Sequence, residues 1–294
     1  MVNNIQIELE KLKIIDSECT KTIYPTTRDN NLIEVRQCQK SNVIFLSAND
    51  YQDDVKYAEK KFTNYWGGGI RNEALKKTYV DDKRRFDQFS ELVRGKIYLD
   101  FGTGLGGVLD LFKPVAKEIY GIELQEEIRK HLEEDHGYTV FNSIDSIPPD
   151  LDFNVISLFH VFEHLSHPLD YLKKIRNKLT SDGKVIIEVP HANDALISLF
   201  KVEEFKKFTF WSEHLILHTR NSLEVYLKEA GFKDIVIKGY QRYPLANHLY
   251  WMLKGKPGGQ IEMNYFQSHG LNTEYADLLN TIDKTDTLIA IAEK

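Results

Sequence analysis

The chain has 294 residues, of which 42% are hydrophobic, and a formal net charge of -6 at pH 7. This length and apolar content predict one large globular domain, or a main domain with an appendage. A net negative charge argues against a nucleic-acid partner, because phosphates are met by basic surfaces. Two cysteines are too few for a disulfide framework, and the sequence shows neither a signal-peptide pattern nor an apolar run of membrane-spanning length. We therefore expect a cytoplasmic protein with a small-molecule ligand and no membrane partner.

Residues 1–48 carry short alternating apolar runs, at 5–9, 32–35 and 43–45, which predict a β-rich appendage. Residues 49–95 are expected to be a helical lid or linker, with helices over 50–66 and 72–93. Tyr65 and Trp66 precede three glycines between these helices, which suggests a flexible joint next to the substrate. The basic residues at 76–85 alternate with aspartates, a pattern that predicts a solvated helix face and leaves an anion-binding patch as the alternative.

Residues 97–112, IYLDFGTGLGGVLDLF, have the pattern of a strand, a tight loop and a helix. Gly102, Gly104 and Gly106 let the backbone turn sharply beside a ligand, and the amides that open the helix should point to the same place. With Gly107 in the third position, the loop also fits the dinucleotide fingerprint. Asp100 favours S-adenosylmethionine over a dinucleotide, because a carboxylate suits an ammonium or sulfonium group better than a diphosphate. The loop thus favours S-adenosylmethionine as the ligand.

Strands and helices alternate after the glycine loop, which predicts an α/β fold with a parallel sheet. Strands are expected at residues 97–101, 118–122, 139–141, 155–159, 184–189, 232–238 and 287–292. Ligands of open α/β sheets bind at the carboxyl ends of the strands. The residues expected at this edge are Asp100, Glu123, Asn142, His160 and Pro190. The aromatic-rich stretch 239–286 is expected to be an insertion that covers the site.

Four segments beyond residue 95 share their residues with a known family. They are DFGTGLG at 100–106, YGIE at 120–123, HVFEH at 160–164 and the Glu213-His214 pair followed by His218 and Thr219. Together they resemble the class I S-adenosylmethionine-dependent methyltransferases, in particular those that act on small molecules. The resemblance implies a Rossmann-like catalytic domain over residues 96–294, in which the last two strands form an antiparallel edge.

The resemblance also implies which residues bind S-adenosylmethionine. Asp100 and the loop amides would hold its methionine part, Glu123 its ribose and residues 142–144 its adenine. The full set of expected cofactor residues is Asp100, Phe101, Gly102, Thr103, Gly104, Gly106, Glu123, Leu124, Asn142, Ser143, Ile144, Phe159, His160 and His164.

Methyl transfer to a hydroxyl also requires removal of a proton, whereas an amine needs alignment alone. Histidine is suited to this task because its pKa lies near ~6.5. The candidates are His160, His164, His191 and His214. We favour His214, since the carboxylate of Glu213 can orient its ring or share the base role, and then His191. The expected acceptor-binding residues are Tyr65, Trp66, Arg242, Tyr243 and His248.

Residues 36–46 resemble the second half of a zinc ribbon that precedes the catalytic domain in some sugar methyltransferases. Cys19 and Cys38 each lack the second cysteine of the family's pairs, so we expect a ribbon-like appendage without a metal. This likeness favours a sugar, or a nucleotide-activated sugar, methylated at oxygen or nitrogen.

Three alternatives remain open. The first is carbon methylation of a keto-sugar, although Trp211 stands where such enzymes carry a tyrosine. The second is an NAD-dependent oxidoreductase, and the third is a noncatalytic module that keeps the cofactor-binding fold. The sequence specifies neither the acceptor nor the oligomeric state.

Overall fold

A computed structural model describes residues 3–49 and 71–294 of the chain. Within these ranges, the centre is a seven-stranded sheet in the order β10-β11-β8-β7-β4-β5-β6. Its strands are β4 (Ile97–Phe101), β5 (Glu118–Ile122), β6 (Thr139–Phe141), β7 (Phe153–Phe159), β8 (Leu179–Pro190), β10 (Lys233–Tyr240) and β11 (Thr287–Glu293). Strands β8 to β6 are parallel, whereas β11 runs antiparallel to β8 and β10. This confirms the Rossmann-like sheet with an antiparallel edge.

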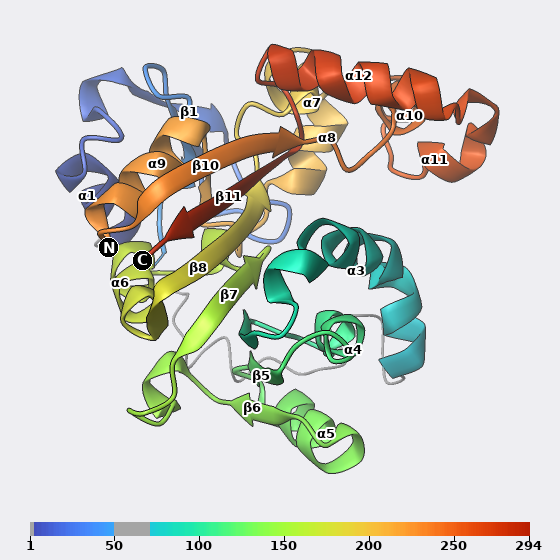
Figure 1. Ribbon diagram of the computed structural model, residues 1–294. Coiled ribbons are helices and arrows are strands. Elements are labelled where there is room, and N and C mark those ends of the chain that lie inside the picture. The colour runs from blue at the N-terminus through green and yellow to red at the C-terminus, as the bar shows by residue number, and fades with distance from the viewer. Residues whose placement is uncertain (1–2, 50–70) are drawn as a thin grey trace.

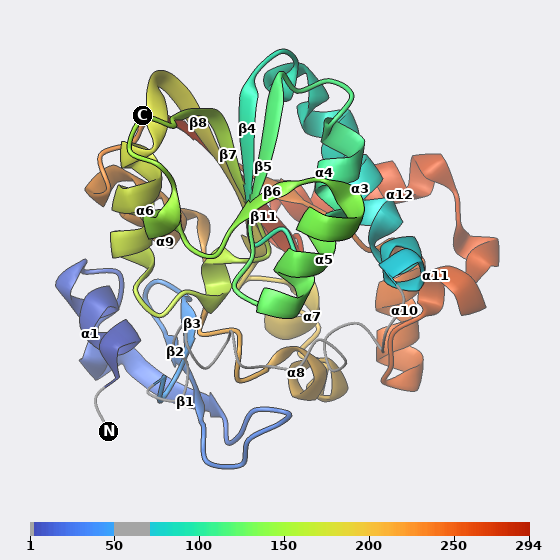
Figure 2. The same ribbon diagram turned by 90° about the horizontal axis from the view of Figure 1, so that it is seen from below.

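Helices cover both faces of the central sheet. Helices α6 (Pro168–Asn177) and α9 (Arg220–Glu229) lie on one face, and α3 (Arg71–Val93), α4 (Gly107–Phe112) and α5 (Glu126–His136) lie on the other (Figures 1 and 2). The strands are apolar because both of their faces are covered; in β7 every residue except Asn154 is buried. The apolar runs therefore located the central strands well.

Helix α3 is tied to the sheet by buried charges. Arg84 donates hydrogen bonds of 2.9 and 2.8 Å to the two carboxylate oxygens of Glu188 in β8, and Arg85 donates a third of 2.9 Å. Burial alone would raise the pKa of Glu188, but the arginines hold it well below its usual range. The prediction of a solvated face is wrong for Arg84 and Arg85, because a buried carboxylate at the end of β8 attracts both.

The N-terminal part contains a helix that the sequence analysis missed. Residues expected as a strand at 5–9 belong to α1 (Asn4–Lys11). Ile5 and Leu9, four residues apart, are buried, whereas Ile7 is 53% exposed. Asn3 caps the helix by accepting a hydrogen bond from the backbone N–H of Gln6. The prediction was wrong because Ile5 and Leu9 fit one face of a helix as well as one face of a strand, and Ile7 completes an alternating pattern although the helix leaves it exposed.

After turn η1 (Ser17–Cys19), the N-terminal part forms strands β1 (Thr20–Tyr24), β2 (Val35–Cys38) and β3 (Ile44–Leu46). A fourth strand, β9 (Ile216–Leu217), completes this antiparallel sheet and comes from the main domain. Cys19 and Cys38 are free thiols at the start of the β1–β2 pair. The predicted appendage is thus β-rich, as expected, and shares its sheet with the segment that follows Glu213 and His214.

The expected insertion, residues 239–286, is mostly helical. It contains α10 (Leu245–Lys254), α11 (Gly259–Glu262), η5 (Asn264–Phe266) and α12 (His269–Thr281). Figure 1 shows these helices, with α7 (Ala195–Ser198) and α8 (Glu203–Thr209), beyond the end toward which the arrow of β8 points. In the described part of the chain, no helix combines the length and the apolar content that crossing a membrane requires.

Candidate active site

A cavity of about 940 Å³ opens at the carboxyl ends of the central strands. Asp100, Glu123, His160 and Pro190 line it, as the strand-edge argument predicts, whereas Asn142 does not. The volume lies at the upper end of the range for small-molecule sites, about 300–1,000 Å³. The cavity therefore has room for a cofactor and a small acceptor together.

The glycine loop after β4 adopts the left-handed backbone that its composition predicts. The φ angles of Gly102, Gly104 and Gly106 are +77°, +50° and +76°. A Cβ on Gly102 would lie 2.5 Å from Cγ2 of Val161, whereas a Cβ on Gly104 would have no heavy atom within 4 Å among the described residues. Gly102 thus permits close packing against the segment after β7, and Gly104 faces the open cavity. Gly106 does not line the cavity.

Asp100 lies at the cavity wall with only 3% of its surface exposed. Its Oδ1 accepts a hydrogen bond of 2.6 Å from the hydroxyl of Ser157. Burial raises the pKa of Asp100 to about 6, even though Ser157 stabilises the carboxylate. A cation bound next to Asp100 would stabilise the ionised form.

Glu123 holds the glycine loop and the start of the next helix together. Its Oε2 accepts a hydrogen bond of 3.1 Å from the N–H of Gly104, and its Oε1 accepts one of 2.8 Å from the N–H of Gln125. The expectation that the loop amides point at a ligand is therefore wrong for Gly104, because the buried carboxylate of Glu123 takes that amide. Gln125 also lines the cavity, and its buried Oε1 has no hydrogen-bond partner among the described residues.

The stretch expected next to the adenine does not reach the cavity. Ser143 precedes turn η3 (Ile144–Ser146), in which Ser143 and Ser146 bond to each other, and Ile144 is buried in the hydrophobic core. Asn142 lies at the strand end without lining the cavity. The assignment of Asn142, Ser143 and Ile144 to the adenine stays a prediction, whereas Leu124, another expected cofactor residue, and Gln125 line the cavity.

Turn η4 (Phe162–His164) follows β7 and brings an acid and a base to the cavity. The side chain of Glu163 is fully buried, and its Oε1 lies 3.2 Å from Nδ1 of His160 and 3.8 Å from Nε2 of His164. The Nδ1–H of His164 donates a hydrogen bond of 2.7 Å to the backbone carbonyl of Glu213. His160 has a positive φ of 55°, a conformation that non-glycine residues rarely adopt and that is concentrated at functional sites.

His214 and Glu213 also line the cavity, beside this turn. The rings of His214 and His164 are 5.1 Å apart between centres. Burial, and then the neighbouring His164, lower the pKa of His214 to about 3. His214 is therefore neutral at neutral pH and is a weak base. Glu213 supplies its backbone carbonyl to His164.

His191 follows β8 and also lines the cavity. Its Nδ1–H donates a hydrogen bond of 3.0 Å to the carbonyl of Thr285, and burial lowers its pKa to about 4. Asp194 and Asp286 line the same part, and burial, together with the charge of Asp286, raises the pKa of Asp194 well above its usual range. These two acids were not anticipated, because they lie in loops without a sequence pattern of their own.

The candidates for acceptor binding in the insertion all line the cavity. Arg242 is already engaged: its guanidinium pairs with Asp81 of α3 and donates a hydrogen bond of 2.9 Å to Nε2 of His160. His248 is hydrogen-bonded to the hydroxyl of Tyr275 at 2.7 Å. Tyr243 is 42% exposed at the edge of the cavity. Tyr65 and Trp66, with the helix expected over residues 50–66, lie outside the described residues.

Comparison with protein families explains this arrangement. Residues 71–236, from helix α3 into strand β10, match the family described as a methyltransferase domain. They include the glycine loop, Glu123, turn η4 and His214. The chain belongs to this family. It is a class I S-adenosylmethionine-dependent methyltransferase, and the alternative of an NAD-dependent oxidoreductase is excluded.

Individual relatives of this methyltransferase are distant. The tRNA U34 carboxymethyltransferase of Vibrio cholerae is 23% identical over 158 residues, which cover 49% of this chain and 47% of the relative. The same enzyme of Proteus mirabilis is 25% identical over 155 residues, with the same coverage. The chain thus spans about half the length of these curated relatives. A solved methyltransferase structure from Archaeoglobus fulgidus has a TM-score of 0.50 at 20% identity, covering 79% of this chain and 98% of that one, which is a likeness of fold.

The methyltransferase takes its methyl group from S-adenosylmethionine, and the residues present fit this cofactor. Asp100 offers a buried carboxylate to the ammonium group, and Gln125 offers an unpartnered buried oxygen within the described chain. The expected cofactor residues that line the cavity are Asp100, Phe101, Gly102, Thr103, Gly104, Glu123, Leu124, Phe159, His160 and His164. Gln125 was missed, although its place two residues after the acidic strand end was a usable signal.

Proposed function

We propose that this methyltransferase methylates an oxygen or nitrogen atom of a small polar acceptor, and that a sugar or nucleotide-activated sugar is the preferred class. The polarity of the cavity beyond the glycine loop carries the proposal. His191, Asp194 and Asn247 line it, although each is less than 5% exposed. Asp194 and Asn247 each accept one backbone hydrogen bond, from Leu196 and Gly258, whereas the buried Nε2 of His191 has no hydrogen-bond partner within the described residues. A ligand rich in hydroxyl or amino groups can bond to this nitrogen and to the remaining polar positions of the other two side chains.

The same part of the cavity has aromatic walls. Trp211, Trp251 and Phe208 line it together with the acids. Sites for small molecules usually combine apolar and aromatic surface with a few polar groups that fix orientation. A sugar ring presents C–H faces as well as hydroxyl groups, which supports this acceptor class.

His214 is the residue that we assign to the acceptor's hydroxyl. At neutral pH the ring is uncharged and has a nitrogen lone pair, because burial lowers its pKa to about 3. It lies at the cavity wall next to Glu213, and His191 also lines the cavity. These three residues, rather than the glycine loop, are expected to affect turnover more than cofactor affinity.

The curated relatives suggest RNA as a second acceptor class, since they are named for tRNA U34. Two observations favour the small acceptor. The chain has a net charge of -6, and Arg84 and Arg85 are bonded to Glu188 inside the protein. A protein that binds RNA uses such cations at its surface to contact phosphates.

The test is an acceptor screen with S-adenosylmethionine. Nucleotide sugars, free amino sugars and bulk tRNA are incubated separately with the enzyme, and S-adenosylhomocysteine and the methylated acceptor are measured by mass spectrometry. We expect turnover with a sugar-containing acceptor and, for His214→Ala, reduced turnover at an unchanged calorimetric affinity for S-adenosylhomocysteine.

Three results would contradict the proposal. Turnover with tRNA alone would establish the RNA alternative. Deuterium exchange at an acceptor carbon would indicate carbon methylation. Binding of S-adenosylhomocysteine without turnover of any acceptor would indicate a noncatalytic module.

A further inference from the structure

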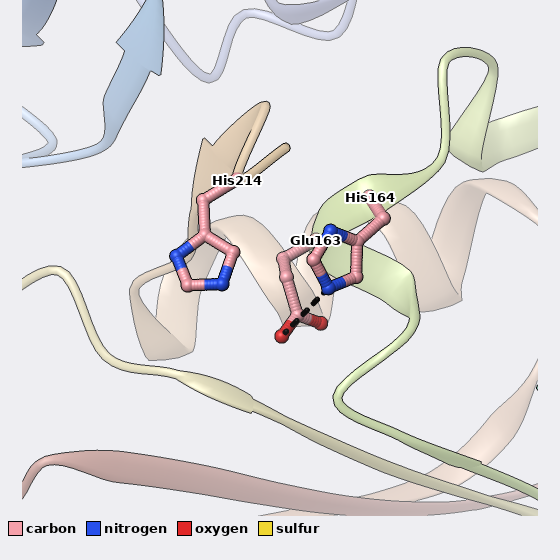
Figure 3. A group of neighbouring side chains, drawn as sticks. All are labelled: Glu163, His164 and His214. Carbon is pink, nitrogen blue, oxygen red and sulfur yellow. Dashed lines mark ion pairs between the residues drawn. The ribbon is translucent and has the colours of Figure 1, made fainter. Parts of the chain in front are cut away.

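Glu163, His164 and His214 form a compact group in the cavity (Figure 3). One possible ligand atom of each residue lies within 4.8 Å of those of the other two. The first two residues come from turn η4, and the third comes from the segment that leads into β9. Figure 3 shows a ring nitrogen of each histidine on the side of the Glu163 carboxylate. The fold thus brings three metal-ligand types to one point.

The carboxylate of Glu163 is buried and only partly bonded. Its Oε1 is hydrogen-bonded to Nδ1 of His160 at 3.2 Å, whereas its Oε2 has no hydrogen-bond partner anywhere in residues 3–49 and 71–294. A carboxylate oxygen that is removed from water without a donor or a cation is costly. The oxygen therefore indicates a missing positive partner.

Both histidines are oriented so that one ring nitrogen can reach a cation beside Glu163. Because Nδ1–H of His164 donates to the carbonyl of Glu213, the lone pair of a neutral ring is on Nε2, the nitrogen 3.8 Å from Glu163. A hydrogen bond from the other ring nitrogen to a carbonyl is the usual support for a metal-ligating histidine. In His214 the ring nitrogen on the side of Glu163 is Nε2 (Figure 3), whereas the buried Nδ1, which has no hydrogen-bond partner within the described chain, points away from the group. Each histidine thus turns its Nε2 toward the carboxylate.

We propose that Glu163, His164 and His214 bind a divalent transition-metal ion, such as Zn²⁺ or Mn²⁺, on the acceptor side of the cavity. Two imidazoles and one carboxylate suit these ions better than Mg²⁺, which prefers oxygen ligands. Metal–ligand bonds of about 2.0–2.2 Å place two ligand atoms at most about 4.4 Å apart. The three side chains must therefore move toward one another by a few tenths of an ångström when they bind the ion. Three protein ligands leave a position open for an oxygen of the acceptor.

This site deepens the proposed function, and its catalytic role rests on that function. A divalent ion lowers the pKa of a hydroxyl that it holds, so His214 acts on the hydroxyl as a ligand of the ion and does not need to take up the proton itself. The hydroxyl proton leaves to water, and the oxygen then forms the bond to the methyl carbon. The carbon–sulfur bond of the sulfonium breaks at the same time and leaves its electron pair on sulfur. The acceptor class is therefore a hydroxyl compound, best with a second oxygen that can chelate the ion.

Metal binding is tested on the full-length enzyme. The protein is treated with EDTA, desalted, exposed to Zn²⁺ or Mn²⁺, separated by gel filtration and analysed for bound metal. We expect about one equivalent in the wild type, and at least about tenfold weaker binding in Glu163→Gln and in His214→Ala. His167→Ala is the matched control, because His167 is an exposed histidine three residues beyond His164 and outside the group. Calorimetric binding of S-adenosylhomocysteine shows that each variant is folded.

Two outcomes overturn the inference. One is a wild type that binds S-adenosylhomocysteine but retains neither ion. The other is equal metal binding by the wild type, Glu163→Gln and His214→Ala, which would place the ion elsewhere. The proposed function can be wrong while the metal site is correct. An enzyme that binds the ion at this site but methylates none of the hydroxyl or amino acceptors would contradict only the proposed acceptor class.

Discussion

Arg84 and Glu188 are 104 positions apart in the sequence, and the arginine donates a hydrogen bond to each oxygen of the carboxylate. The same carboxylate lies 3.2 Å from Nε2 of His160, which lines the cavity. Helix α3 and the end of β8 are thus joined directly behind the active site. Arg84, Arg85 and His160 all lie against the buried carboxylate of Glu188, so replacement of Glu188 should lower the stability of the whole domain.

Glu188→Ala is expected to lower the free energy of unfolding by about 3–5 kcal/mol, because the guanidinium groups of Arg84 and Arg85 stay buried without their partner. Urea denaturation followed by circular dichroism measures the loss. Glu91→Ala is the control, since Glu91 pairs only with Arg94 at the surface in the described structure, and we expect no measurable change. Equal stability of the two variants would show that the buried ion pairs do not support the fold.

Cofactor affinity should depend on pH through Asp100. Burial raises the pKa of Asp100 to about 6, and the ammonium group of the cofactor favours the ionised form. Affinity is therefore full above this pKa and falls by up to about tenfold per pH unit below it, because the carboxyl must lose a proton on binding. Calorimetry with S-adenosylhomocysteine from about pH 5 to about pH 8 measures the change.

The variant Asp100→Asn separates this effect from other titrating groups. We expect it to bind S-adenosylhomocysteine about 1–3 kcal/mol more weakly and with little pH dependence over the same range. Asp145→Asn should behave as the wild type, since Asp145 pairs with Lys174 at the surface. A wild-type affinity that stays constant down to about pH 5 would remove Asp100 from the cofactor site.

Gly102→Ala should destabilise the glycine loop by about 1–3 kcal/mol, because its Cβ would lie 2.5 Å from Cγ2 of Val161. The positive φ of +77° adds a backbone penalty of about 1–2 kcal/mol. Gly104→Ala isolates the backbone penalty, since no heavy atom of the described residues lies within 4 Å of the added carbon. Thermal unfolding of both variants and of Gly102→Ala/Val161→Ala measures the two contributions. A double variant no more stable than Gly102→Ala would rule out the contact with Val161 as the cause.

Arg242→Gln should loosen the insertion over the cavity. The charge of Arg242 outweighs burial and lowers the pKa of Asp81 to about 2, so the ion pair between the insertion and α3 is present at neutral pH. We expect faster cleavage within residues 239–286 by thermolysin under native conditions. Lys254→Gln, an exposed change at the end of α10, should be cleaved at the wild-type rate. Equal rates for both variants would show that Arg242 does not anchor the insertion.

The sequence alone was sufficient to predict the features that depend on the local pattern of residues. Continuous apolar runs located the central strands, because a covered parallel sheet needs apolar residues on both faces, and the glycines located the loop after β4. The strand-edge rule then placed Asp100, Glu123 and His160 in one cavity. The family resemblance supplied the cofactor.

Features that depend on distant partners could not be predicted in this way. Arg84 and Arg85 pair locally with Asp81 and Asp82, which suggested an exposed face, but the acid that buries them, Glu188, lies more than 100 positions away. Asn142 follows the carboxyl end of β6, as predicted, but the chain after it turns so that Ile144 packs in the hydrophobic core. In α1, an eight-residue segment offered too few apolar positions to distinguish a helix from a strand.

Strand β9 begins two residues after His214 and, within the described residues, pairs in its sheet with β3 of the N-terminal part. The acceptor side of the active site is therefore assembled from β3 and the segment around His214, which lie far apart in the sequence. The ribosome completes the first region long before the second. Exchange of the first 48 residues between related enzymes should alter which acceptor is used while the donor half keeps its affinity. Deletion of residues 1–46, which include β3, would remove the strand that supports the segment of His214.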